Sequence, residues 1–86
     1  MIVYIVRYDY IKHWASNFSV HINEKEAKQN SEYPYKNIHS TYIGPIEVPY
    51  HNYNYDRDKI VSWLNARPEL WSLDDEDRLN PEIVFQ

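Results

Sequence analysis

The longest uninterrupted apolar run of the chain, Ile2 to Val6, constrains the fold more than any other segment. It is much shorter than the roughly 20 residues of a membrane-spanning helix, so we expect no spanning segment and no membrane partner. The run is rich in β-branched residues and apolar on both faces, which is typical of a strand in the interior of a sheet. We therefore expect residues 2 to 8 to form a central strand.

Four further segments carry strand signals. Phe18 to Asn23 alternates strictly and is expected to run antiparallel to the first strand. Ile38 to Ile43 has β character up to a predicted turn at Gly44-Pro45. Ile46 to Val48 is expected as a short edge strand, and Glu82 to Phe85 as a terminal strand.

Capping residues and periodicity predict the helices. Asn23, with Glu26 three positions later, predicts a helix start with a capping box. Asn54 or Asp56 is expected to cap a second helix over residues 58 to 66, which has one apolar face. That face comprises Ile60, Trp63 and Leu64. A third, short helix is expected from Ser72 through Leu79.

The expected fold is a single α+β domain over residues 1–86, a length that suffices for one core. The order is β-β-α-β-(β)-α-α-β, and we expect a small, single-layer, mostly antiparallel sheet with two or three short helices on one face. The absence of cysteine excludes a disulfide framework and a thiolate zinc site, and it favours a reducing, cytoplasmic setting.

Several kinds of site are excluded by composition and spacing. With Gly44 as its single glycine, the chain cannot form a P-loop, a dinucleotide-binding turn or a nucleophile elbow. The four histidines show none of the common metal-ligand spacings, and the acidic run at residues 74–77 lacks the spacing and the glycine of a calcium loop. We expect no cofactor and no metal.

The charge is unevenly distributed. Residues 1–43 carry five Lys/Arg and four Asp/Glu, a balance of +1, whereas residues 44–86 carry four and nine, a balance of −5. The total of −4 disfavours direct binding of nucleic acid, whose phosphates the acidic half would repel. A protein partner with a basic surface, such as a nucleic-acid-binding protein, is the expectation.

Nine tyrosines point to binding, because a tyrosine at an interface presents a rigid ring and leaves its hydroxyl wet. Several of these tyrosines fall within predicted strands or at the end of a predicted helix. Tyr50, Tyr53 and Tyr55 instead alternate with polar residues in a predicted loop, so we expect them to anchor a partner.

Residues near the carboxyl end complete the predicted interface. Trp71 is either a buried residue or a partly exposed anchor. Asp74, Asp75 and Asp77 belong to the acidic run, which suits the first turn of a helix and also a patch that steers a basic partner. We expect Trp71 to lie between the three tyrosines and the acidic patch.

Two alternatives remain open to this non-enzymatic, protein-binding interpretation. His21 and His39 would form a general acid/base pair in a small metal-independent nuclease or other hydrolase if their strands paired. A self-associating structural protein would instead pair Glu82–Phe85 or Ile46–Val48 across the edge of a homodimer.

In composition, the chain resembles small phage-encoded inhibitors of host machinery, of the anti-restriction and anti-CRISPR type. The features that carry the resemblance are the absent cysteine, the polar aromatic loop Tyr50 to Tyr55 and the acidic run at residues 74–77. The resemblance implies an inhibitor that acts in the host-cell cytoplasm. Such a protein would block a basic nucleic-acid-binding surface of a host defence or nucleic-acid-processing protein.

Overall fold

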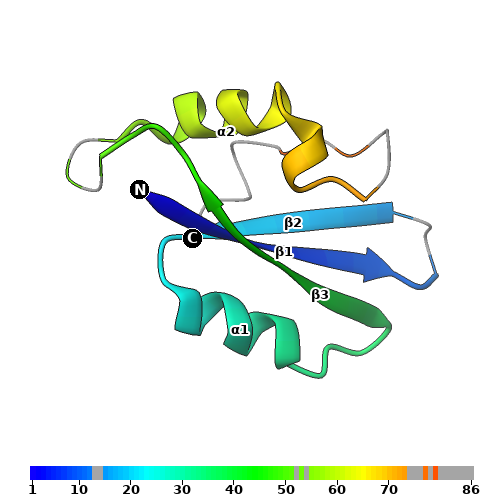
Figure 1. The fold of residues 1–86 in the computed structure, drawn as a ribbon. Helices are drawn as coiled ribbons and strands as arrows, with labels where there is room; N and C mark the ends of the chain where they lie inside the picture. The colour runs from blue at the N-terminus through cyan, green and yellow to red at the C-terminus, as the bar shows by residue number, and fades with distance from the viewer. Residues whose placement is uncertain (13–14, 52, 54, 74–76, 78, 80–86) are drawn as a thin grey trace.

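The computed structural model describes residues 1–12, 15–51, 53, 55–73, 77 and 79 of the chain. Figure 1 shows a small α+β structure, with a three-stranded sheet between two helices. The elements are β1 (Ile2–Tyr10), β2 (Ala15–His21), α1 (Glu24–Glu32), β3 (Ile38–Glu47), α2 (Arg57–Asn65) and the 3-10 helix η1 (Pro68–Leu70).

β1 lies in the middle of the sheet, whose strand order is β2-β1-β3, and it runs antiparallel to both neighbours. The side chains of Val3, Ile5 and Val6 are fully buried. Because Ile5 and Val6 are adjacent in a strand, they point to opposite faces, so both faces of β1 are covered at this point. The predicted central strand is confirmed, and it continues to Tyr10.

β3 is one continuous strand, so the predicted turn at Gly44-Pro45 and the separate strand Ile46–Val48 are wrong. Its pairing with β1 shifts register between Ile5 and Val6, which makes a β-bulge. Gly44 has a φ of 121°, which a residue without Cβ adopts at little cost. Pro45 is tolerated because β3 is an edge strand, where a missing N–H donor need not break the sheet.

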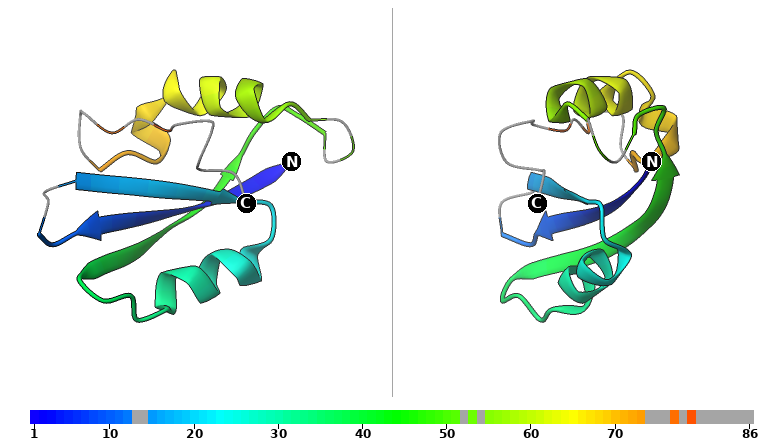
Figure 2. Two further views of the ribbon diagram at one scale, coloured as in Figure 1. Left: turned by 180° about the vertical axis from the view of Figure 1, so that it is seen from behind. Right: turned by 90° about the vertical axis from the view of Figure 1, so that its left-hand side faces the viewer.

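The two helices lie on opposite faces of the sheet, as the views in Figures 1 and 2 agree, so the expectation of helices on one face is wrong. α2 shares the main core with Ile5, whereas α1 lies against all three strands on the other face. Ala27 of α1 is fully buried, as is Val6. A central strand that is apolar on both faces must be shielded from water on both. α1 shields one face and α2 shields the other.

Both predicted helix starts are capped. Asn23 Oδ1 accepts hydrogen bonds from two backbone N–H groups of the first turn of α1, at 2.9 and 3.3 Å. Asp56 Oδ1 does the same for α2, at 2.8 and 3.4 Å. The buried face of α2 contains the predicted Ile60 and Leu64, while Trp63 is half-buried against the core.

The predicted third helix and the terminal strand fall largely beyond the described part of the chain. Ser72, Leu73, Asp77 and Leu79 are described and are not helical. The segment Glu82–Phe85 lies outside the described residues. Among the helices that are described, none is long and apolar enough to cross a membrane.

Candidate functional site

The predicted tyrosine loop, residues 50–55, is attached to the main core. The rings of Tyr50 and Tyr55 are partly buried and pack against the core cluster. The Met1 ammonium donates hydrogen bonds to the carbonyl oxygens of Val48 at 3.1 Å and Tyr50 at 2.6 Å. Tyr53, by contrast, is 99% exposed. Of these three predicted anchors, Tyr53 is therefore the one whose ring lies in solvent.

Trp71 is buried, with 1% of its surface exposed. Its Nε1–H donates a hydrogen bond of 2.7 Å to the carbonyl oxygen of Leu64, and its ring meets Phe18 edge-to-face at a centroid distance of 5.1 Å. A buried indole normally needs a partner for its N–H, and α2 supplies one here. In this conformation Trp71 belongs to the core and not to the surface.

Asp77 also points inward, with 8% of its surface exposed. Its carboxylate forms an ion pair with the Arg7 guanidinium and accepts a hydrogen bond of 3.1 Å from the backbone N–H of Leu73. Asp74 and Asp75 lie outside the described residues. The described member of the predicted acidic patch is therefore bound to β1 through Arg7.

Asp9 extends this ion pair into a network. Arg7 Nε donates to Asp9 Oδ1 at 2.8 Å, and the Ser16 hydroxyl donates to the same oxygen at 2.6 Å. Burial alone would raise the pKa of Asp9, but the hydrogen bonds from Ser16 and Arg7 outweigh it and hold that pKa below its ordinary value. Asp9 is therefore a carboxylate at neutral pH, and its bond to Ser16 links β1 to β2.

His21 and His39 do not form a catalytic pair. His21 lies on β2 opposite Tyr4, and His39 lies on β3 opposite Asp9, with β1 between the two strands. Cross-strand partners share a face, and Tyr4 and Asp9 are an odd number of positions apart, so the two imidazoles lie on opposite faces of the sheet. The condition that their strands pair is not met, so the hydrolase hypothesis loses its catalytic pair.

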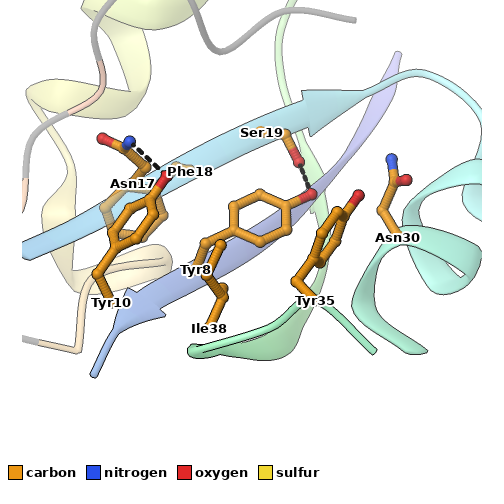
Figure 3. A pocket seen from close by; sticks show the side chains of 8 residues that line it. All are labelled: Tyr8, Tyr10, Asn17, Phe18, Ser19, Asn30, Tyr35 and Ile38. Atoms are coloured by element: carbon orange, nitrogen blue, oxygen red, sulfur yellow. Dashed lines mark hydrogen bonds between the residues drawn. The ribbon is translucent and has the colours of Figure 1, made fainter. Parts of the chain in front are cut away.

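A pocket of about 290 Å³ opens on the α1 side of the sheet. Figure 3 shows Tyr10, Tyr8 and Tyr35 following one another across it, with Ser19 beside the Tyr8 hydroxyl. The lining residues come from β1, β2, α1, the segment between α1 and β3, and the start of β3; they are Tyr8, Tyr10, Asn17, Phe18, Ser19, Asn30, Tyr35 and Ile38. None of these side chains is charged.

The rings around this pocket contact one another. Tyr8 and Tyr35 meet edge-to-face, with centroids 6.0 Å apart and an interplanar angle of 85°. Tyr33, which is 60% exposed, lies 4.5 Å from the Tyr35 centroid and extends the aromatic surface outward. The phenols that the structure brings together therefore belong to residues 8–35 and not to the tyrosine loop.

A chain of polar groups runs from the pocket into the interior. The hydroxyls of Tyr8 and Ser19 are 2.8 Å apart, and Ser19 Oγ lies 2.7 Å from Nε2 of the buried His21. Burial raises the pKa of Tyr8, against the opposing effect of its hydrogen bond to Ser19. Burial lowers the pKa of His21, and the nearby Glu26 carboxylate opposes this shift. Both side chains are therefore neutral at pH 7.

A second pocket, of about 340 Å³, is lined by His21, Glu26, Gln29 and Asn30. Asn30 also lines the first pocket. We refer to the two pockets together as the β2–α1 groove. Glu26 is the one charged side chain among the residues that line it, because His21 is neutral at pH 7.

The burial of His21 predicts a pH-dependent stability. Its folded-state pKa lies below the ordinary value of about 6.5, so the unfolded chain binds the proton more readily. The stabilising effect is fully present above about pH 6.5 and is lost as the pH falls through the folded-state pKa. We expect urea unfolding at pH 7.5, 6.5 and 5.5 to give a falling free energy of unfolding.

A matched pair of variants isolates this effect. His21→Gln should flatten the fall in the free energy of unfolding below pH 6.5. His39→Gln changes an exposed residue and should leave this pH dependence unchanged. The slope from one histidine is at most about 1.4 kcal/mol per pH unit. An unchanged slope in His21→Gln would show that another group is responsible.

Sequence reasoning missed the groove because its parts lie far apart along the chain. One signal was available: Tyr8 and Tyr10 are two positions apart in a strand and so share a face. Asn17, Ser19 and His21 give the same spacing on β2, which makes one face of that strand polar. Nothing local indicated that α1 and the segment after it would bring Asn30 and Tyr35 to this face.

These features define the class of protein: a small α+β structure with a tyrosine-lined groove between a strand and a helix, in which Glu26 is the one charged residue of the described lining. No cluster of His, Cys, Asp and Glu suited to a metal ion occurs within the described residues. Comparisons with protein-family models, with curated proteins and with solved structures find no match for the chain.

Proposed function

We propose that this protein is a non-enzymatic protein-binding module and that its partner contacts the β2–α1 groove. The single observation that carries the proposal is the convergence of Tyr8, Tyr10 and Tyr35 on one open pocket. Tyrosine is enriched among the residues that contribute most to protein interfaces, since its ring binds with little loss of conformational freedom.

The polar groups of the groove support recognition of a polypeptide. Asn17, Ser19 and Asn30 offer both donors and acceptors among the rings, which suits the mixed polar and apolar surface of a protein segment. The groove is also shaped by packed elements: Tyr8 and Ser19 lie in paired strands, and Asn30 lies in a capped helix. A site built on such elements can bind without first becoming ordered.

The test is capture of a partner by three forms of the protein: wild type, Tyr35→Ala and Tyr53→Ala. Both tyrosines are partly or fully exposed, so neither substitution should unfold the protein. We expect Tyr35→Ala to reduce capture of the specific partner by about tenfold or more, and Tyr53→Ala to leave it nearly unchanged. Quantitative mass spectrometry of the captured proteins measures the ratio, and circular dichroism checks the fold of each form.

A second candidate function is favoured by the exposure of Tyr53. An inhibitor of the phage-encoded type would use this ring, beside the exposed Asp56 and Asp58, to cover a basic surface of a host nucleic-acid-processing protein. It predicts the opposite result, in which Tyr53→Ala abolishes capture and Tyr35→Ala does not. That outcome would contradict the groove as the binding site.

A further inference from the structure

We propose that the β2–α1 groove binds an arginine side chain of the partner, with its guanidinium against the tyrosine rings and near the Glu26 carboxylate. The inference rests on the proposed function, because it names the chemistry recognised at the same site. Three properties of the groove lead to it: the ring faces, the free acceptors and the sign of the charge.

The ring faces suit a planar cation. Tyr8 and Tyr35 are almost perpendicular, and Tyr10 lines the other end of the same pocket. The face of a phenol ring carries negative potential and attracts a cation placed within about 6 Å of its centre. A guanidinium is flat and weakly hydrated, so it stacks on such a face more readily than a compact ammonium does.

The hydrogen bonds within the groove leave the Tyr8 oxygen available as an acceptor for the ligand. The Tyr8 oxygen lies 2.8 Å from Ser19 Oγ, and either hydroxyl of this pair can donate. A phenol oxygen has two lone pairs, and the bond to Ser19 uses at most one of them. At least one lone pair of Tyr8 therefore remains for the ligand, and a guanidinium carries donors only. Burial raises the pKa of Tyr8, which keeps this hydroxyl protonated and neutral.

The charge of the groove favours a cation over an anion. Glu26 is the charged residue of its lining, and it is a carboxylate. Lys12 and Lys36 are exposed in the turns next to Tyr10 and Tyr35, but neither lines the groove. A nucleotide would require cations that follow its phosphates, and the lining supplies none. The net charge of −4 also attracts a basic partner over a longer range.

The experiment is a titration of the isotope-labelled protein, followed by NMR, with the tripeptide acetyl-Gly-Arg-Gly-amide. The matched control peptide carries citrulline, which has the shape of arginine without its charge. We expect the arginine peptide to shift the backbone amide signals of Tyr8, Ser19 and Asn30, and to bind about fivefold more tightly than the citrulline peptide.

Two variants test the named contacts. Tyr35→Leu keeps an apolar side chain but removes the ring, and Glu26→Gln removes the charge; each should weaken binding of the arginine peptide about threefold to tenfold. Tyr53→Leu, outside the groove, should bind like the wild type. Circular dichroism of each variant confirms that it is folded.

Three results would overturn the inference: equal affinity for the two peptides, no change at the groove up to the solubility limit of the arginine peptide, or tighter binding of adenosine monophosphate at the same residues. The first two leave the proposed function standing if Tyr35→Ala still loses the partner in the capture experiment. Loss of capture with Tyr53→Ala alone would instead remove the proposed function.

Discussion

Replacing Trp71 with alanine should lower the free energy of unfolding by about 3–5 kcal/mol, the usual cost of removing a buried aromatic side chain. The side chain is almost completely buried, meets Phe18 edge-to-face and donates a hydrogen bond to the carbonyl oxygen of Leu64. The substitution leaves a cavity between the sheet and α2 and leaves that carbonyl group without the indole donor. Because small domains are stable by only about 5–15 kcal/mol, much of the stability would be lost.

Urea unfolding followed by far-ultraviolet circular dichroism measures the effect. Trp71→Phe should cost less, since it keeps a ring against Phe18 and loses the hydrogen bond and only part of the buried ring volume. Leu70→Ala is the control, because Leu70 is the adjacent residue and is 46% exposed, and it should change stability by about 0.5 kcal/mol or less. If Trp71→Ala were as stable as Leu70→Ala, Trp71 would have to be a surface residue.

Replacing Arg7 with methionine should destabilise the protein by about 3 kcal/mol, at the lower end of the range for breaking a buried ion pair. Methionine has a comparable apolar length but lacks the guanidinium that pairs with Asp77, bonds Asp9 and lies over the Phe18 ring. The side chains of Arg7 and Asp77 are 12% and 8% exposed, so water can replace the missing partner only in part. The midpoint of urea unfolding at pH 7 measures the loss.

A double variant separates the ion pair from the packing. Arg7→Met combined with Asp77→Leu should be more stable than the sum of the two single effects predicts, because neither member of the Arg7–Asp77 pair is left without the other. The control is Lys28→Ala, which breaks the exposed pair between Lys28 and Glu24 and should hardly move the midpoint. Additive single effects would show that Arg7 and Asp77 act independently.

The parts of the fold that were predicted correctly depend on local chemistry. The apolar run Ile2 to Val6 identified the central strand, and Asn23 and Asp56 identified the two helix starts, because capping needs only the next few backbone N–H groups. The faces on which the helices lie were not predicted. That choice depends on which side of the sheet each connection crosses, and no local pattern encodes it.

The candidate site was harder to predict than the fold for the same reason. Tyr50, Tyr53 and Tyr55 were selected because they are neighbours in sequence, yet two of these rings pack against the core. Tyr8 and Tyr35 are 27 positions apart and meet only after β1, β2 and α1 have assembled. The nine tyrosines favoured a binding surface, but their positions along the chain did not show which ones would converge.

The β-bulge in β3 also affects how the protein behaves when concentrated. β3 is an edge strand of the sheet, and an exposed edge can recruit strands from other molecules and grow into aggregates. In β3 the register shift beside Gly44, followed by Pro45, interrupts the regular row of donors that an added strand would need. The one glycine of the chain and the proline beside it thus give this edge built-in resistance to fibre-like growth.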